Sequence, residues 1–238
     1  MTTTTPKKTL RIGILYEEVQ MADLVGIDII GNCSSRVVDM MTALIPSATT
    51  VQFPSIDMEF LYIASTLEPT WTTPKMFVRP THTYDNAPRD LDIILIGGPN
   101  PATVPEASLK FLREASRLTK TILTTCTGGM WLAKSGVLDG RKATTNRMLL
   151  GSAKSSMPNV EWLDQRWVVD KGHFDGAELW TAGGAGCGID MVIEYALKTF
   201  DQALVGMACT SLEFEVKERS QNYAGPLATA LQVNLEVV

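Results

Sequence analysis

Cys126 is the residue whose type and surroundings point most directly to chemistry. The apolar, β-branched run 120–125 has the composition of a buried strand, and 127–135 predicts a helix that ends at Gly136. Cys126 therefore lies at a strand-to-helix junction, the position that raises the nucleophile above the sheet in hydrolases with a Gly-x-Ser-x-Gly elbow. Because a helix N-terminus favours negative charge, we expect the pKa of this thiol to fall below its ordinary value. The alternative is a cysteine that serves only as a small buried hydrophobe.

A Gly97-Gly98-Pro99 turn ends a strand predicted from Asp90. In doubly wound sheets, sites form at the carboxyl ends of the strands, so this turn is expected beside Cys126. We expect the backbone N–H groups of Gly98 and Thr127 to form an oxyanion hole next to the sulfur, with Gly97 in the same substrate-binding turn. Taken alone, the Gly-Gly-Pro sequence predicts no more than a tight turn.

Asp23 is the acidic residue best placed to act together with the cysteine. It lies just past the first predicted strand, 10–16, at the start of an apolar helix. Its carboxylate is expected either to cap that helix or to act as a general acid/base held out of water. Glu17 and Glu18 are expected to belong to a solvated loop.

The other residues that often carry chemistry are expected to be structural or solvated. The glycine-rich run 183–188 does not match Gly-x-Gly-x-x-Gly and has no first βαβ unit around it, so no dinucleotide is expected. His82 lies in a Thr/Tyr/Asn loop and His173 in a predicted hairpin turn. No His, Asp or Glu cluster has metal-ligand spacing, so we expect neither a metal nor another cofactor.

The composition is typical of a soluble globular protein, with 45% hydrophobic and 20% charged residues. The net charge of −5, without a Lys/Arg cluster, argues against nucleic acid or an anionic membrane as a partner. The apolar runs are too short to span a bilayer, and the N-terminus lacks the apolar segment of a secretory signal. Widely spaced cysteines without a Cys-x-x-Cys pair fit free thiols in a reducing compartment. We therefore expect a cytoplasmic protein.

The predicted elements alternate between strands and helices. Strands are predicted at 10–16, 49–53, 90–96, 120–125 and 144–145, with a hairpin of two strands within 161–170 and 178–183; helices are predicted at 21–43 with a break near Gly31, and at 105–118, 127–135, 147–156, 189–200 and 203–217. This order predicts one α/β domain over residues 10–223, a doubly wound, mostly parallel sheet with helices on both faces. Residues 1–9 are expected to be a disordered tail and 224–238 a C-terminal extension, whereas 54–80 shows no clear pattern.

Several sequence blocks together resemble one known family over residues 11–223. They are Arg11-Ile-Gly-Ile-Leu-Tyr, Asp23-Leu-Val-Gly, Ile96-Gly-Gly-Pro, Thr125-Cys-Thr-Gly-Gly, Gly136-Val-Leu-Asp-Gly-Arg-Lys-Ala-Thr-Thr and Trp180-Thr-Ala-Gly-Gly-Ala-Gly-Cys-Gly-Ile-Asp. The chain resembles the ThiJ/PfpI family of the class I glutamine amidotransferase-like superfamily. The resemblance implies a flavodoxin-like fold, a homodimer, and Cys126 as the nucleophile-elbow cysteine.

Within this family, two residues resemble the isonitrile (isocyanide) hydratase branch. Asp23 falls where most members carry a glutamate that hydrogen-bonds the sulfur, and Thr127 follows the cysteine where protease- and glyoxalase-like members usually have His or Ala. One position departs from the family, because Asn146 replaces the histidine of the common Ala-Thr-Thr-His sequence. A Cys-His-Glu triad then cannot form, and the chemistry is expected to run on Cys126 and Asp23.

The resemblance implies a cofactor-free cysteine enzyme of the hydratase or lyase kind that acts on a small electrophilic metabolite. In the isonitrile version, the Cys126 thiolate attacks the terminal carbon and Asp23 delivers a proton to it. The resulting thioimidate is hydrolysed to an N-substituted formamide, so that two smaller barriers replace one. Three alternatives stay open: glyoxalase- or deglycase-like action on 2-oxoaldehydes, a redox or stress-response protein with an oxidisable thiol, and a small-molecule sensor that has lost catalysis.

Overall fold

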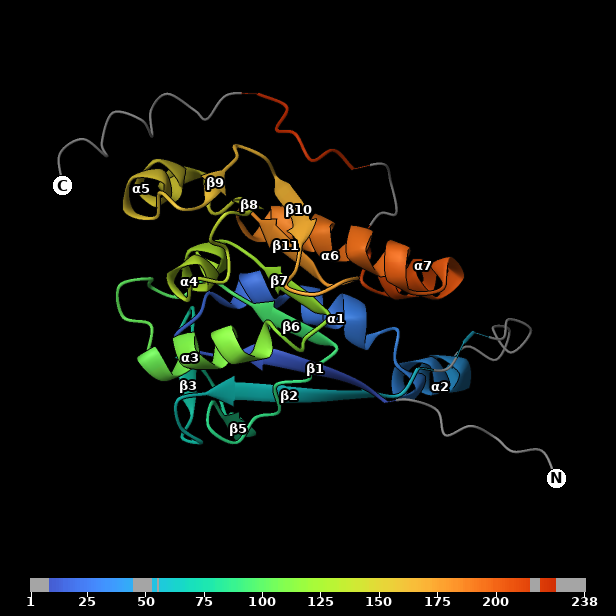
Figure 1. The fold of residues 1–238 in the computed structure, drawn as a ribbon. Coiled ribbons are helices and arrows are strands. Elements are labelled where there is room, and N and C mark those ends of the chain that lie inside the picture. Colours follow the sequence, from blue (N-terminus) through green and yellow to red (C-terminus); the bar gives the residue numbers. More distant parts are fainter. Residues whose placement is uncertain (1–8, 45–52, 55, 215–218, 226–238) are drawn as a thin grey trace.

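A seven-stranded sheet forms the centre of the computed structural model, which describes residues 9–44, 53–54, 56–214 and 219–225 (Figure 1). Its strands are β1 (Leu10–Leu15), β2 (Met58–Ala64), β5 (His82–Thr83), β6 (Ile93–Ile96), β7 (Thr121–Thr124), β10 (Trp167–Lys171) and β11 (Glu178–Ala182). The order is β10-β11-β7-β6-β1-β2-β5, and only the β10–β11 pair is antiparallel. The predicted doubly wound, mostly parallel α/β fold is confirmed.

Helices cover both faces of this sheet (Figure 1). They are η1 (Met21–Leu24), α1 (Gly26–Gly31), α2 (Ser35–Leu44), α3 (Glu106–Ala115), α4 (Gly128–Lys134), η3 (Arg147–Leu149), α5 (Leu150–Ser156), α6 (Ala185–Thr199) and α7 (Gln202–Ser211). α1, α6 and α7 pack against one another in one layer, and α3 packs against α4 in the other. Among the helices of the described residues, none has the length and apolar character needed to cross a membrane.

The two central strands, β6 and β7, are buried along their whole length. A parallel strand covered on both faces has no solvent side, so its sequence is a continuous apolar run instead of an alternating one. The run Ile93–Ile96 shows this pattern directly. On the α3–α4 side, Phe111 and Trp131 are fully buried, and the Trp131 indole N–H donates to Ser108 Oγ at 2.9 Å.

Some predicted elements differ from the structure. The strand predicted at 144–145 is replaced by β8 (Lys142–Ala143), which pairs with β9 (Glu161–Trp162) in a separate two-stranded sheet. The helix predicted from 189 begins earlier, at Ala185. The helix predicted at 203–217 ends at Ser211. Most of the predicted strand at 49–53, of the N-terminal tail and of the C-terminal extension lies outside the described residues; residue 53, which is described, is not in a strand.

The segment 54–80, which showed no clear pattern, contains β2 and a small hairpin of β3 (Thr70–Thr72) and β4 (Met76–Val78). The hairpin is attached to the segment that precedes Asp23. The Thr73 N–H donates to Val19 O at 3.2 Å, and the Met21 N–H donates to Thr73 Oγ1 at 3.2 Å. The residues that follow β1 are therefore held in place from two directions, by the sheet and by the hairpin.

The glycine-rich run 183–188 packs α6 against the loop that leads to the predicted nucleophile. Gly184 is the N-cap of α6, and a Cβ atom placed on Gly188 would lie 2.3 Å from Thr125 Oγ1. A side chain there cannot be accommodated unless Thr125 moves, so glycine permits the close approach. This packing accounts for the glycine at position 188.

Candidate active site

The backbone at Cys126 forms a sharp turn between β7 and α4. Cys126 has a φ of 59°, which is uncommon for a residue with a side chain. Its N–H donates to Gly183 O at 2.5 Å, and its carbonyl accepts from Thr145 Oγ1 at 2.9 Å. A Cβ on Gly128 would lie 2.6 Å from the Ile96 carbonyl oxygen, so α4 begins directly against β6. This is the strained elbow geometry predicted for a nucleophile.

Asn146 contacts the sulfur directly. Its Nδ2 lies 3.1 Å from Cys126 Sγ, and its Oδ1 accepts from the Met148 N–H at 3.0 Å as the N-cap of η3. The second bond fixes which end of the amide faces the thiol, because only Oδ1 can accept from a backbone N–H. From its sequence, this position was expected only to lack the histidine of the family, and its contact with the sulfur was not predicted. Its place directly after the Ala-Thr-Thr block was the available signal.

Asp23 is buried in η1, with 3% of its surface exposed. Its Oδ2 accepts from the Gly98 N–H at 3.1 Å, and its Oδ1 has no hydrogen-bond partner among the described residues. The N-cap of η1 is Gln20, whose side chain makes no capping bond. The carboxyl group therefore bonds across the sheet edge to the β6 turn instead of capping its own helix.

The pKa values of the two groups reflect this burial. Burial raises the pKa of Asp23 to about 6, partly offset by the Gly98 N–H and by Cys126. Burial, followed by the neighbouring Asp23 charge, also raises the pKa of Cys126, against the lowering effects of Asn146 and the Thr127 N–H. The expected fall in the cysteine pKa is therefore wrong, because desolvation and a nearby carboxylate outweigh the lowering effects of Asn146 and the Thr127 N–H.

The predicted oxyanion residues lie together, but they are tightly packed. A Cβ on Gly98 would lie 2.6 Å from Thr127 Oγ1 and 2.7 Å from Asp23 Oδ2, and one on Gly97 would lie 2.9 Å from Leu24 Cδ2. The Thr127 hydroxyl donates to Pro99 O at 2.6 Å. In this arrangement the Gly98 N–H holds the Asp23 carboxylate, whereas the Thr127 N–H faces the sulfur.

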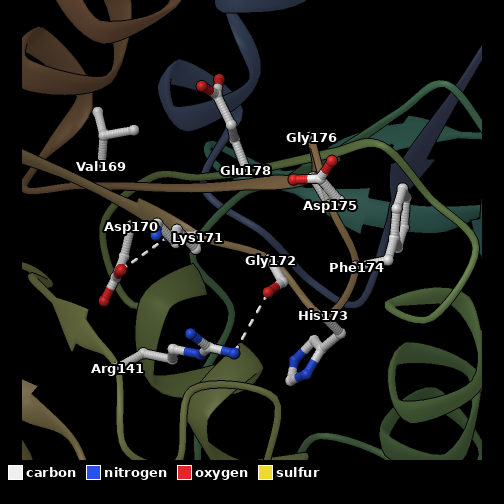
Figure 2. Close-up of a pocket in the computed structure, with 11 residues that line it drawn as sticks. Arg141, Val169, Asp170, Lys171, Gly172, His173, Phe174, Asp175, Gly176 and Glu178 are labelled. Carbon is white, nitrogen blue, oxygen red and sulfur yellow. Dashed lines mark hydrogen bonds between the residues drawn. The ribbon is translucent and has the colours of Figure 1, made fainter.

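The other residues considered from sequence lie apart from this centre. Glu17 Oε1 accepts from the Ser65 N–H at 2.7 Å, and His82 Nδ1 lies 2.9 Å from Thr81 Oγ1. His173 Nε2 lies 3.0 Å from the Val137 carbonyl. His173 lines an open cavity at the β10–β11 turn (Figure 2), which has a volume of about 800 Å³ and which Cys126, Asp23 and Asn146 do not line. Within the described ranges, no group of His, Cys, Asp and Glu could hold a metal ion.

A family model described as the DJ-1/PfpI family matches residues 46–197. The chain belongs to this family, which confirms the resemblance drawn from its sequence blocks.

Three similar proteins show the range within the family. The chain is 26% identical over 207 residues to an isonitrile hydratase from Pseudomonas putida, covering 85% of this chain and 75% of that protein. It is 25% identical over 124 residues to the HTH-type transcriptional regulator GbdR from Pseudomonas aeruginosa, covering 52% of this chain and only 32% of the regulator. A ThiJ/PfpI family protein from Pseudomonas syringae has a similar structure, with a TM-score of 0.71 and 20% identity over 99% of this chain and 91% of that one.

Proposed function

We propose that this protein is a cofactor-free, cysteine-dependent hydratase of isonitriles or closely related small electrophiles. The observation that carries the proposal is a buried carboxylate, Asp23, close enough to Cys126 to influence the pKa of its thiol, while the Asn146 amide donates a hydrogen bond to the sulfur. The similarity to an isonitrile hydratase supports the same chemistry.

The pKa values indicate which of the two groups, Cys126 or Asp23, is protonated before substrate binds. At neutral pH the Cys126 thiol carries the proton, and the Asp23 carboxyl, with a pKa of about 6, is mostly ionised. Asp23 is then ready to accept a proton from the thiol as the sulfur attacks. A group whose pKa lies near the working pH is suited to accept and return a proton in turn.

The reaction follows from that assignment. The sulfur bonds to the terminal isonitrile carbon, the thiol proton passes to Asp23, and Asp23 returns it to that carbon, giving a thioimidate, Cys–S–CH=N–R. Water then adds to the C=N bond, the C–S bond breaks, and the products are R–NH–CHO and the free thiol. Asn146 and the Thr127 N–H stabilise the negative charge that develops on sulfur.

Among the described residues, no second base lies beside the sulfur, and this separates the proposed reaction from acyl transfer. Asn146 can donate a hydrogen bond, but an amide cannot accept a proton from a nucleophile or deliver one to a leaving amine. Hydration of an isonitrile needs only one shuttled proton before hydrolysis. The site therefore fits addition chemistry better than an amidotransferase or protease mechanism.

The surroundings of the sulfur favour an uncharged substrate. The cation next to Asn146 in sequence, Arg147, is committed to a bidentate ion pair with Asp164, at 2.8 and 2.9 Å. Its guanidinium also donates to Gly225 O at 2.9 Å. A substrate carboxylate would have to compete for this arginine with a partner already held in ideal fork geometry.

Turnover of p-nitrophenyl isocyanide to the corresponding formamide tests the proposal, with methylglyoxal as the competing substrate. We expect the isocyanide to be consumed by the wild-type protein and not by Cys126→Ala. Asp23→Asn should lose about 10²-fold or more in rate, the effect of removing a general acid/base. Preferred turnover of methylglyoxal, or activity that survives in Cys126→Ala, would replace this proposal with the glyoxalase-like alternative or a non-covalent mechanism.

A second candidate is a small-molecule-sensing module, favoured by the match to a transcriptional regulator. Saturable isocyanide binding to the wild-type protein without product formation would support this candidate.

We also infer a homodimer from the family and a cytoplasmic location from the cysteines. Cys33, Cys126, Cys187 and Cys209 are all free, as expected in a reducing compartment. The mass of the protein in solution, by light scattering, tests the dimer.

A further inference from the structure

Residues 219–225, here called the strap, lie beside β10 (red in Figure 1). The Arg166 N–H donates to Gln221 O at 2.6 Å, and Arg166 Nη1 donates to Ser220 O at 3.3 Å. Arg219, whose side chain is 3% exposed, binds Asp190 Oδ1 at 2.8 Å, and Asp190 also pairs with Arg166. The strap is thus held against the domain by backbone hydrogen bonds and by a carboxylate that two arginines share.

Tyr223 lies at the centre of the contacts that the strap makes. The Arg147 guanidinium sits 4.0 Å from the centre of its ring. The same guanidinium donates to Gly225 O in the strap and forms the fork with Asp164. The Arg147 side chain is therefore held by the ring, by a strap carbonyl and by a carboxylate, an arrangement that leaves it little freedom.

The contacts of the strap lie next to the two residues that bond to Cys126, Asn146 and Gly183. Arg147 directly follows Asn146, the residue that donates to Cys126 Sγ. On the other side, a Cβ placed on Gly183 would lie 2.5 Å from the Tyr223 hydroxyl, and the Gly183 carbonyl accepts the Cys126 N–H. The strap therefore borders the residue that positions the sulfur and the residue that positions its backbone.

We propose that Tyr223 is a positioning residue that, by stacking on Arg147, holds Asn146 against the sulfur of Cys126. In this proposal the strap helps to position the residues around Cys126. Its effect on turnover rests on the proposed function, but its effect on the thiol does not, because the Asn146–Cys126 bond exists without substrate.

The stack acts without a charge on the tyrosine. Burial, followed by the nearby Cys187, holds the pKa of Tyr223 well above its usual value, so the ring stays neutral at working pH. The charged or titratable groups around it are Cys187, Arg147 and Asp164. Among the described residues, Asp23 is the titratable group that faces Cys126.

The test is the pH dependence of iodoacetamide alkylation at Cys126, followed by peptide mass spectrometry in the free protein. Asn146→Ala removes a donor that favours the thiolate, so the midpoint of alkylation should rise by about 1 pH unit. Tyr223→Ala should move the midpoint in the same direction by roughly half as much. The double variant should move no further than Asn146→Ala, because both changes remove the same interaction.

Three further variants complete the design. Tyr223→Phe keeps the ring on Arg147 and should behave as wild type, as should Phe174→Ala, which truncates a partly exposed aromatic side chain at the β10–β11 turn. Arg147→Lys, which keeps the charge but loses the planar stack and the fork, should reproduce the shift of Tyr223→Ala. It tests the same connection if Tyr223→Ala does not fold.

An unshifted midpoint in both Tyr223→Ala and Arg147→Lys would overturn the proposal. A double variant whose shift equals the sum of the Tyr223→Ala and Asn146→Ala shifts would overturn it as well. A protein that hydrates no isonitrile but shows the coupled shifts would refute the proposed function and leave this inference standing. Isonitrile turnover without coupled shifts would support the proposed function and refute this inference.

Discussion

At the scale of single residues, the proposed base, Asp23, is buried beside the Cys126 thiol. Within the described part of the chain, Asp23 receives one backbone hydrogen bond and no cation lies beside it, so burial outweighs stabilisation and its pKa rises to about 6. An ionised carboxylate in this position costs stability. In the proposed mechanism this carboxylate is the proton acceptor next to Cys126, and groups with such shifted pKa values are common at functional sites.

Asp23→Asn should therefore change stability in a pH-dependent way. Below about pH 4 the carboxyl is protonated in both the folded and the unfolded states, so it contributes no difference. Between about pH 4 and 6 the unfolded state loses its proton first, and above pH 6 the full cost is present. The variant should gain up to about 3 kcal/mol over wild type at pH 8 and little at pH 4. Urea unfolding at the two pH values measures this, with Asp175→Asn in an exposed loop as the control; a destabilised variant at pH 8 would contradict the assignment.

Asn146 should matter for rate more than for stability. A hydrogen bond to developing charge on sulfur is worth about 1.5–3 kcal/mol, so Asn146→Ala should lower kcat/KM by about 10- to 100-fold. Asn146→Asp should be worse, because it removes the donor and places a second carboxylate beside the thiol. Steady-state kinetics on p-nitrophenyl isocyanide measures both, with Asn32→Ala, remote from the sulfur, as the control. Equal rates for the three variants would exclude Asn146 from the reaction.

At the scale of elements, the elbow depends on close packing between α6, α4 and the ends of β6 and β7. Strand and helix positions around Cys126 could be predicted, because buried parallel strands and the Gly136 helix stop leave clear local patterns. The contact between Asn146 and the sulfur could not, because it joins residues 20 apart through the η3 cap. The burial that raises the cysteine pKa is likewise a property of the assembled layers, not of the helix N-terminus alone.

Two glycines of α6 provide a matched pair for testing this packing. A Cβ on Gly188 would lie 2.3 Å from Thr125 Oγ1, whereas one on Gly186 would meet nothing within 4 Å. Gly188→Ala should destabilise the protein by about 1–3 kcal/mol and disturb the residue before Cys126. Gly186→Ala should be neutral or stabilising by up to about 1 kcal/mol, since it adds a better helix former in open space. Thermal unfolding compares the two, and similar melting temperatures would contradict the packing described.

At the scale of the whole molecule, the doubly wound fold followed from the alternation of elements, while its accessory parts did not. The β3–β4 hairpin and the strap have short, mixed sequences whose positions are fixed by distant partners such as Val19, Arg147 and Arg166. Local sequence patterns do not predict contacts with such distant partners. The surroundings of the active site were accordingly the least predictable part of the chain.

Labelling of the four cysteines measures how tightly the domain is packed. Cys33 and Cys209 are fully buried, and burial raises the pKa of Cys33 to about 12, so neither should react in the folded protein. Native iodoacetamide labelling should reach only Cys126 and the half-buried Cys187. Cys33 and Cys209 should be labelled only as urea unfolds the domain, in step with the loss of circular dichroism. Early labelling of either would indicate a domain less tightly packed than described.

The central claim is that Cys126 forms a covalent adduct whose carbon receives its proton through Asp23. Acid-quenched mass spectrometry during turnover of p-nitrophenyl isocyanide tests it most directly. The account predicts wild-type protein carrying one substrate mass on the peptide that contains Cys126, with little such adduct in Asp23→Asn and none in Cys126→Ala. Two results would contradict it. One is that wild-type protein produces formamide but carries no adduct at Cys126 in quenches from milliseconds to steady state. The other is that Asp23→Asn carries as much adduct as wild type.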